Sequence, residues 1–134
     1  MSHSLGNAGE HLVCFESFYY GYQAVMVEYL TQYDVLLFDK GTPFKIQVKT
    51  SSRTRTEGKS FKYCIKTYNM HKEKIKGGYK ERNVDIFACV HPELRKIAYI
   101  PYDQVRTNWE ITITPDDYDN LTLKSALFFL QNEL

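Results

Sequence analysis

The sequence contains few cysteines, and they follow no recognised pattern. There are three in 134 residues, Cys14, Cys64 and Cys89. An odd number without CxxC spacing argues against a disulfide framework and against a structural zinc site. We therefore expect a reducing, cytoplasmic compartment, and we predict that all three side chains are small apolar residues of the core.

Long apolar segments and paired metal ligands are also missing. No apolar run reaches the length of a membrane span and no signal-peptide pattern opens the chain, so we expect no membrane partner. The four histidines lack the pairing that a zinc finger or an H-N-H nuclease requires. Neither a Ser-His-Asp elbow nor a glycine-rich phosphate loop is present. Several common classes of hydrolase and metal-binding protein are thereby disfavoured.

The charged residues are strongly segregated along the chain. The formal net charge is only +1, yet 13 of the 17 Lys and Arg residues lie between Lys40 and Arg82, together with only 3 of the 16 acidic residues. A separation of this size indicates a polyanion-binding surface on one side of the molecule. An ordinary solvated basic helix and loop is the alternative.

The composition, 43% hydrophobic and 25% charged, predicts one globular domain over residues 1–134. Helical periodicity predicts a first helix over 4–20, and the apolar run over 83–90 predicts a buried parallel or central strand. The order of helices and strands is typical of a small α/β or α+β domain. The remaining predicted elements are strands over 22–29, 33–39, 44–50, 61–66 and 96–100, a short basic helix over 69–76, and a C-terminal helix within 121–134.

The first helix combines an apolar stripe with two glycines. We predict that the stripe of Leu5, Ala8, Leu12, Phe15 and Tyr19 is buried. Gly6 and Gly9 are poor helix formers, which indicates either a close approach by another element or a ligand, or a frayed first turn.

Residues 33–50 predict a hairpin that carries the most informative polar side chains. We place a two-residue turn at Lys40 and Gly41. The resulting antiparallel register pairs Asp34 with Gln47.

Three polar side chains of this hairpin are predicted to meet. Because side chains alternate along a strand, Gln47 and Lys49 share one face, and Asp34 lies across from Gln47. An acid, an amide and an amine in an otherwise apolar hairpin are costly unless they perform chemistry. Glu10 lies near one edge of the buried side of the first helix.

In the order helix, strand, strand, strand, these residues resemble the PD-(D/E)XK nuclease superfamily. The matching segments are Gly-Asn-Ala-Gly-Glu10, Tyr-Asp34 and Gln47-Val48-Lys49. The Gln-x-Lys form is the variant seen in the intron-type homing endonucleases, whereas archaeal Holliday-junction resolvases carry Glu-x-Lys. The resemblance covers about residues 4–105 and implies a restriction-endonuclease-like αβββαβ core, a mixed central sheet flanked by helices.

The resemblance also implies a metal site. Hydrolysis of a phosphodiester requires a stabilised phosphate charge and a hydroxide-like nucleophile, and Mg²⁺, with Mn²⁺ as a substitute, provides both. The predicted ligands are Asp34, the Gln47 amide oxygen, the Val48 backbone carbonyl, and Glu10 directly or through water. Lys49 is predicted to orient the attacking water, stabilise phosphate charge or act as a base. Gln47 replaces a commoner acid, which favours a single metal ion and leaves an inactive homologue as an alternative.

The basic segment supplies the predicted substrate surface. Its hydroxyl groups and cations would contact DNA phosphates and make binding strongly dependent on salt. The predicted DNA-binding residues are Thr50, Ser51, Ser52, Arg53, Arg55, Lys59, Lys62, Lys66 and Lys72.

These observations predict a Mg²⁺-dependent, site-specific DNA endonuclease in a prokaryotic, archaeal or phage-infected host cell. The alternatives are a Holliday-junction resolvase acting on branched DNA, a catalytically inactive DNA-binding module on the same fold, and a basic-patch protein that binds other proteins. A symmetric double-stranded substrate needs two cuts and one chain carries one site, so we expect a homodimer or homotetramer, with the helix within 121–134 as a candidate interface.

Overall fold

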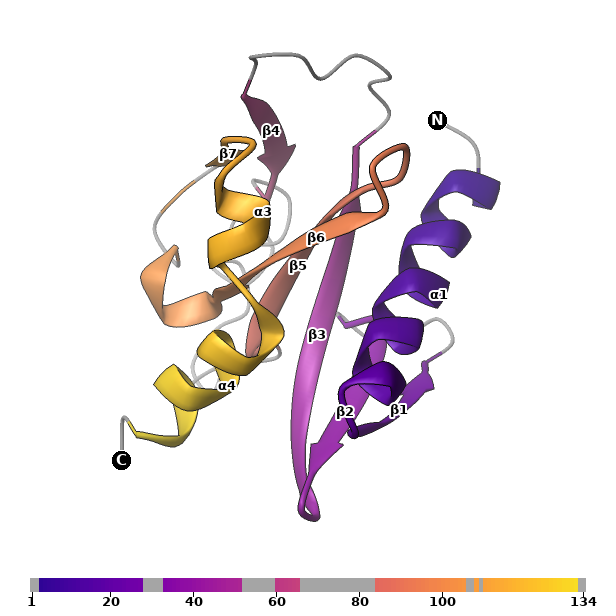
Figure 1. The fold of residues 1–134 in the computed structure, drawn as a ribbon, viewed down its shortest axis with the longest axis vertical. Coiled ribbons are helices and arrows are strands. Elements are labelled where there is room, and N and C mark those ends of the chain that lie inside the picture. Colours follow the sequence, from indigo (N-terminus) through magenta and orange to yellow (C-terminus); the bar gives the residue numbers. More distant parts are fainter. Residues whose placement is uncertain are drawn as a thin grey trace, which may run out of the picture.

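The computed structural model describes residues 3–27, 33–51, 60–65, 84–105, 108 and 110–132. Within these residues there are three α-helices, a 3₁₀ turn and seven strands (Figure 1). The helices are α1 (His3–Tyr19), α3 (Asp117–Asn120) and α4 (Leu123–Gln131), and the 3₁₀ turn η1 is Tyr102–Gln104. The strands are β1 (Gln23–Met26), β2 (Val35–Asp39), β3 (Thr42–Thr50), β4 (Phe61–Cys64), β5 (Ile86–His91), β6 (Lys96–Pro101) and β7 (Glu110–Ile113).

The central sheet has five strands in the order β1-β2-β3-β5-β6. Strands β3 and β5 run parallel, and the other neighbours run antiparallel. Strands β4 and β7 form a separate antiparallel pair. The predicted mixed sheet is therefore confirmed. The buried parallel or central strand predicted over 83–90 is also confirmed, because β5 lies inside the sheet, pairs in parallel with β3 and has six buried residues.

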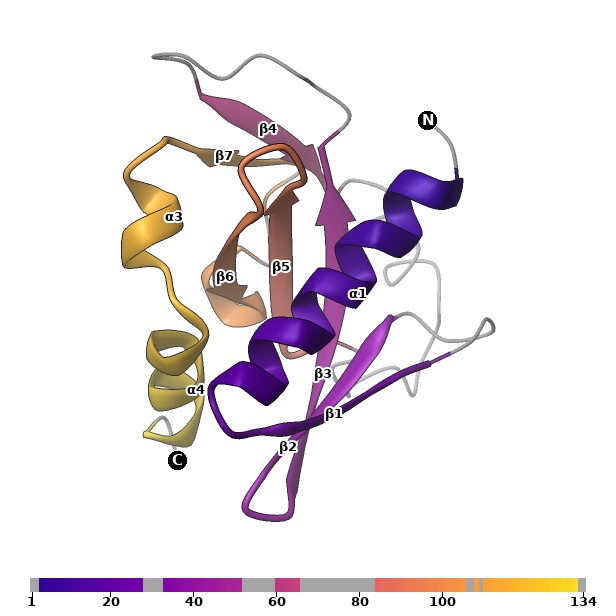
Figure 2. The same ribbon diagram turned by 45° about the vertical axis from the view of Figure 1, so that its right-hand side comes forward.

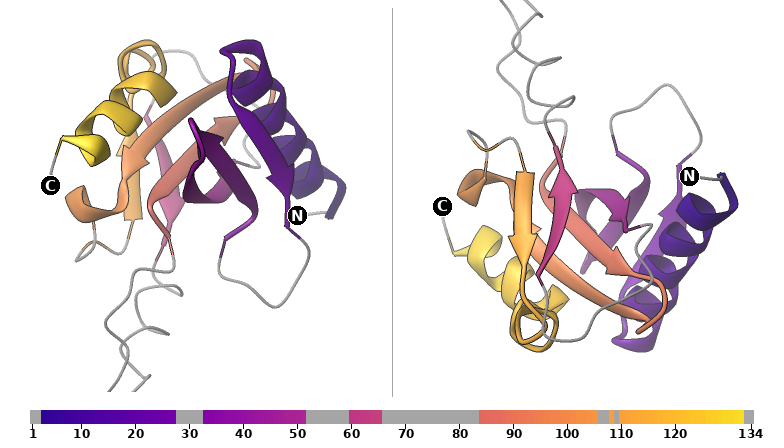
Figure 3. Two further views of the ribbon diagram at one scale, coloured as in Figure 1. Left: turned by 90° about the horizontal axis from the view of Figure 1, so that it is seen from below. Right: turned by 90° about the horizontal axis from the view of Figure 1, so that it is seen from above.

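Apolar side chains from the two faces of the central sheet form two core clusters. The first cluster joins α1 and α4 to one face, through residues such as Val13, Ile46 and Leu127. The second joins the β4–β7 pair to the other face, through residues such as Phe61 and Phe87. The end views in Figure 3 show these layers, with α1 and α4 on one side of the sheet and the β4–β7 pair on the other.

The predicted buried stripe of α1 is wrong. Phe15 and Tyr19 are 62% and 70% exposed, and the buried line consists of Gly9, Val13 and Ser17 instead. These residues recur every four positions and are small, so the helix backbone can lie close to the sheet. The Ser17 hydroxyl donates a hydrogen bond to the Val13 carbonyl over 2.8 Å, which satisfies its buried polar atom.

Other predictions met mixed outcomes. The three cysteines are free, but only Cys89 is a buried core residue, since Cys14 is partly exposed and Cys64 is exposed. Strand β7 and helix α3, each of four residues, were not predicted. The predicted basic helix over 69–76 lies outside the described residues. No described helix is long and apolar enough to cross a membrane.

His91 is a polar residue enclosed by the second cluster. Its side chain is fully buried, in edge-on contact with Phe61 at a ring separation of 4.6 Å and with Tyr118 at 6.0 Å. The backbone N–H of Leu94 donates to His91 Nδ1 over 3.2 Å, so the neutral ring carries its proton on Nε2. Burial lowers the pKa of His91, although a backbone hydrogen bond and the charge of Glu93 raise it.

The lowered pKa of His91 predicts that the protein loses stability as the pH falls. A histidine in the unfolded chain binds its proton at a pKa of about 6.5, so the unfolded state gains a proton before folded His91 does. The free energy of unfolding should then decrease below about pH 6.5 and level off only once folded His91 is protonated.

Urea unfolding of wild type and His91→Asn at about pH 7.5 and about pH 5.5 measures this effect. The variant should lose the part of the pH dependence that His91 contributes, and all other titrating groups cancel in the comparison. An identical dependence in wild type and His91→Asn would contradict the prediction.

Candidate active site

The site lies where β2 separates from β3. The predicted turn is confirmed: Asp39 pairs with Thr42, and Lys40 and Gly41 have φ of 52° and 88°, as a type I′ hairpin turn requires. The ladder ends at the pair Val35–Ile46. Strand β3 continues to Thr50, and among the described strands it pairs beyond that point with β5 alone. As far as the described residues show, the β2 side of β3 is therefore an open edge along residues 47–50.

Asp34 occupies this open edge. It precedes β2 and is not paired with Gln47. The predicted register is therefore correct along the two strands, but the ladder of paired residues ends one residue before it would reach Asp34. Its backbone N–H donates to the Ile46 carbonyl over 2.8 Å, and its carbonyl accepts from Val27 N–H over 2.9 Å. Its Oδ2 accepts from the backbone N–H of Val48 over 2.8 Å. The carboxylate thus replaces the backbone partner that β2 no longer provides.

The Val48 carbonyl lies on the same edge. In an antiparallel ladder, the N–H and C=O of one residue point toward the same neighbouring strand. Because Val48 N–H points to Asp34, its carbonyl also faces the open edge. That orientation is compatible with the ligand role predicted for the carbonyl.

Glu10 approaches Asp34 from α1. Helix α1 crosses the sheet over β3, as Figure 2 shows. Burial raises the pKa of Glu10, and the nearby charge of Asp34 raises it further, while His11 lowers it. Two carboxylates from different elements are therefore close enough to repel each other.

Lys49 supplies the opposite charge. Burial raises the pKa of Asp34, whereas the Val48 N–H and the Lys49 ammonium lower it. Lys49 pairs with Cys89 on β5, and its charge also lowers the pKa of that thiol against the larger effect of burial. The structure thus brings Glu10, Asp34 and Lys49 into one electrostatic group.

Gln47 adds a buried acceptor without a partner. It lies two residues before Lys49 on β3, so the two side chains share the sheet face that carries the β4–β7 pair. Its Oε1 is buried and accepts no hydrogen bond. Among the described residues this acceptor lacks a partner, which costs about 1–3 kcal/mol, and a ligand bound at Oε1 would offset that cost.

Two further contacts fix β3 beneath these side chains. Asp85, just before β5, donates its N–H to the Lys45 carbonyl over 2.7 Å and accepts the Lys45 N–H at Oδ2 over 2.8 Å. Gly9 of α1 lies directly on Thr50, since a Cβ on Gly9 would overlap Thr50 Oγ1 and come within 3.2 Å of its Cβ. The glycine predicted a close approach, but its partner could not be identified from sequence.

The predicted DNA-binding residues are only partly described. Thr50 Oγ1 is buried against Gly9, so this hydroxyl does not face solvent as a phosphate contact would require, and Ser51 is 7% exposed. Lys62 on β4 is exposed and lies 3.9 Å from Glu110. Ser52, Arg53, Arg55, Lys59, Lys66 and Lys72 lie outside the described residues.

The fold and these groups define the class of the protein. A model of the family described as PD-(D/E)XK endonuclease matches residues 3–126, and the chain belongs to this family. The fold is accordingly the restriction-endonuclease-like α+β fold. A comparison with curated proteins finds no match.

Two solved structures share the fold. The bacterial homing endonuclease I-Ssp6803I is 15% identical, with a TM-score of 0.68 over 97% of this chain and 93% of that one. Hjc, a Holliday junction resolvase from the archaeon Archaeoglobus fulgidus, is 16% identical, with a TM-score of 0.56 over 90% of this chain and 94% of that one. At these identities the similarity establishes the fold alone.

The donor set fits a hard divalent cation. Among the described residues, no three His, Cys, Asp or Glu side chains form a metal cluster. The candidate ligands are two carboxylates, an unpartnered amide oxygen and a backbone carbonyl, all oxygen donors of the kind that Mg²⁺ and Mn²⁺ prefer.

The contact between Gly9 and Thr50 predicts opposite effects for the two glycines of α1. Gly9→Ala should destabilise the protein by about 1–3 kcal/mol, because the added methyl group overpacks the contact with β3. Gly6→Ala is the matched control, since a Cβ there meets nothing within 4 Å. It should stabilise the helix by up to about 1 kcal/mol.

Urea unfolding of these variants measures both effects, and adding Thr50→Ala to Gly9→Ala should recover part of the loss. Equal effects of the two alanines would show that α1 does not rest on Thr50.

Proposed function

We propose that the chain is a Mg²⁺-dependent DNA endonuclease that cuts at specific sites, with Mn²⁺ as a substitute. One observation carries the proposal. Two repelling carboxylates lie near Lys49 at the open edge of β3, on a strand that also carries the buried amide oxygen of Gln47, and this arrangement supports the proposal. The family to which the chain belongs supports hydrolysis of a phosphodiester as the reaction.

The proposed ligands are Asp34, Glu10, the Gln47 amide oxygen and the Val48 carbonyl. When bound, the cation supplies positive charge at the scissile phosphate and lowers the pKa of a bound water. The hydrogen bond from Val48 N–H holds the Asp34 carboxylate in one orientation. A cation held by Glu10 and Asp34 would also relieve the repulsion that, after burial, raises the pKa of Glu10.

Lys49 is the proposed catalytic cation of the chain itself. Its ammonium lies close enough to Asp34 to lower the pKa of that carboxyl, which supports a shared contact of the two groups with one phosphate. From this position it would donate hydrogen bonds to the phosphate oxygens and stabilise the charge that develops there.

The proposed substrate is double-stranded DNA. The basic segment from Lys40 to Arg82 includes the catalytic strand, and its excess of cations supports a polyanion as the partner. Arg53 and Arg55 follow Lys49 closely in sequence and remain predicted contacts.

Removing the Asp34 charge should abolish cleavage and spare DNA binding. Asp34→Asn keeps an oxygen that can accept the Val48 N–H, so the backbone geometry is retained. Metal charge stabilisation is worth several kcal/mol, so we expect at least about a 100-fold loss in rate. Supercoiled plasmid and a synthetic four-way junction, each with Mg²⁺ and with chelator, provide the assay.

Asp39→Asn is the matched control, since Asp39 is a carboxylate at the other end of β2 that accepts from Gln131 Nε2 over 2.7 Å. It should cleave like wild type. Full cleavage activity in Asp34→Asn would show that Asp34 is not part of the active site. Preference for the junction over the plasmid would favour a resolvase, and salt-dependent binding without Mg²⁺-dependent cleavage would favour an inactive DNA-binding module.

If Gln47 Oε1 binds the metal ion, Mg²⁺ should change the thermal stability of the protein, and this change can be measured without an assay of catalysis. In chelator, Gln47→Leu should raise stability by about 1–3 kcal/mol, because it removes a buried acceptor that lacks a partner. Mg²⁺ should raise the thermal midpoint of wild type and leave that of Gln47→Leu nearly unchanged.

Gln47→Glu is the complementary variant, and its thermal midpoint should respond at a lower Mg²⁺ concentration, because it adds a charged ligand. A wild-type response that Gln47→Leu retains in full would place the metal elsewhere.

A further inference from the structure

One face of β3 carries a row of polar side chains that extends beyond the candidate active site. Lys45, Gln47 and Lys49 alternate with apolar residues that pack into the first core cluster. The row therefore points to the opposite face of the sheet, which carries the β4–β7 pair. The nine residues of β3 include two lysines and no Asp or Glu. Lys45 is the member of this row to which the candidate site assigns no role.

Asp85 fixes the backbone of Lys45. The Asp85 N–H donates to the Lys45 carbonyl over 2.7 Å, and the Lys45 N–H donates to Asp85 Oδ2 over 2.8 Å. These bonds join β3 to the residue before β5, directly ahead of the parallel ladder that begins at Ile46 and Ile86. The point at which the Lys45 side chain leaves the strand is therefore fixed relative to Lys49, four residues further along.

The ring of Tyr33 holds the other end of the Lys45 side chain. Lys45 Nζ lies 5.8 Å from the centroid of that ring, which is within the range of a cation–π contact. Tyr33 is partly buried and packs against the second core cluster, so the ring is itself held in place. Tyr33 also directly precedes Asp34, the proposed metal ligand. An ammonium group that is positioned in advance loses less conformational entropy when it binds an anion.

We propose that Lys45 binds a DNA phosphate that flanks the phosphate being cut. This inference rests on the proposed function and adds a second point at which the same site holds its substrate. Because Lys45 and Lys49 are four residues apart on one face of a strand, their Cα atoms lie about 13 Å apart. One strand of B-DNA presents a phosphate about every 3.4 Å along the helix axis. For a duplex that lies along β3, Lys45 therefore reaches a phosphate within about four nucleotides of the cut.

The contact contributes binding energy rather than chemistry. A lysine ammonium is a compact charge that contacts phosphate without reading a base, so Lys45 would act alike on every sequence. The binding energy is the same before and during the reaction. Loss of Lys45 should therefore raise KM for cleavage and leave kcat nearly unchanged. A purely structural cation–π contact would instead change the stability of the protein and leave the salt dependence of DNA binding unaltered.

The salt dependence of binding tests the contact without requiring cleavage. The probe is a duplex of random sequence, titrated in chelator between about 50 and 200 mM salt. Lys45→Met keeps the apolar stem and removes the charge, so it should reduce the slope of log K against log salt by about 0.9. Over the decade from 1 M to 0.1 M salt, that slope corresponds to about an 8-fold loss of affinity. Lys45→Arg keeps a cation that stacks on aromatic rings and should restore both quantities.

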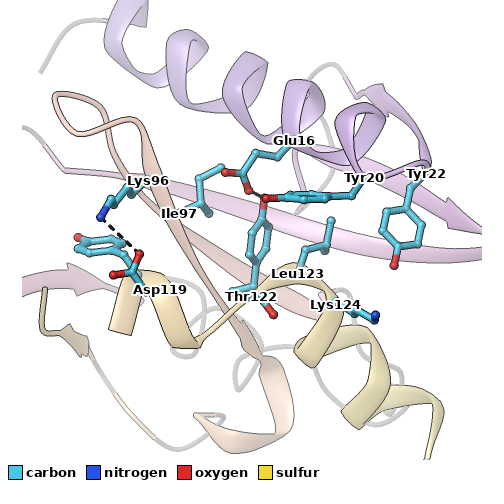
Figure 4. A pocket seen from close by; sticks show the side chains of 11 residues that line it. Glu16, Tyr20, Tyr22, Lys96, Ile97, Asp119, Thr122, Leu123 and Lys124 are labelled. Carbon is cyan, nitrogen blue, oxygen red and sulfur yellow. Dashed lines mark hydrogen bonds and ion pairs between the residues drawn. The ribbon is translucent and has the colours of Figure 1, made fainter. Parts of the chain in front are cut away.

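Lys124→Met is the matched control, because it removes the same charge from α4, which covers the opposite face of the sheet (Figure 4). Its slope should equal that of wild type. Lys45→Gln is a second neutral variant, and urea unfolding checks that each variant folds. A wild-type slope in Lys45→Met and Lys45→Gln would overturn the proposal. An equal reduction in Lys124→Met would also overturn it.

Neutral phosphate analogues locate the contact. Single methylphosphonates are placed in a duplex that carries the cleavage site mapped on the plasmid. Wild type should lose affinity at one position within about four nucleotides of the cut, and Lys45→Met should lose nothing further there. Identical losses in the two proteins at every position would contradict the contact. A protein that shows the expected salt slopes but never cuts DNA would refute the proposed function and leave the Lys45 contact intact.

Discussion

The early end of the β2–β3 ladder is the constraint on which the site depends. Pairing stops at Val35 and Ile46, while β3 continues along β5 to Thr50. Backbone groups on that stretch of β3 would lack partners on the β2 side, and the Asp34 carboxylate accepts one of them. The same break that leaves an open strand edge therefore fixes a charged side chain beside Lys49.

Close packing of α1 extends this arrangement to a third element. Because Gly9 has no side chain, the helix rests on Thr50 and places the next residue, Glu10, beside Asp34. Glu10 belongs to a helix, Asp34 to a loop and Lys49 to a strand, so packing of the central sheet determines their separation. The electrostatic cost of bringing two carboxylates together is consistent with a site built for a cation.

Sequence alone predicted the hairpin turn, the register of β2 on β3 and the central parallel strand, because each depends on local or periodic signals. Lys40 and Gly41 set the turn, and the apolar run marks β5. The break at Asp34 was not predictable. The alternation of side chains shows which residues share a face of the sheet, but it does not show at which residue the pairing of two strands stops. The stripe on α1 was mispredicted because large rings were preferred as core residues, whereas close contact with the sheet selects Gly9 and Ser17.

The central claim is that one divalent cation bridges Asp34 and the orphaned amide of Gln47. A crystal grown with Mn²⁺ tests it most directly through the anomalous signal of the metal. The account predicts a peak at the open edge of β3, within about 2.0–2.3 Å of the Asp34 carboxylate and Gln47 Oε1. Full Mn²⁺ occupancy elsewhere, with Gln47 Oε1 still lacking a partner, would contradict it.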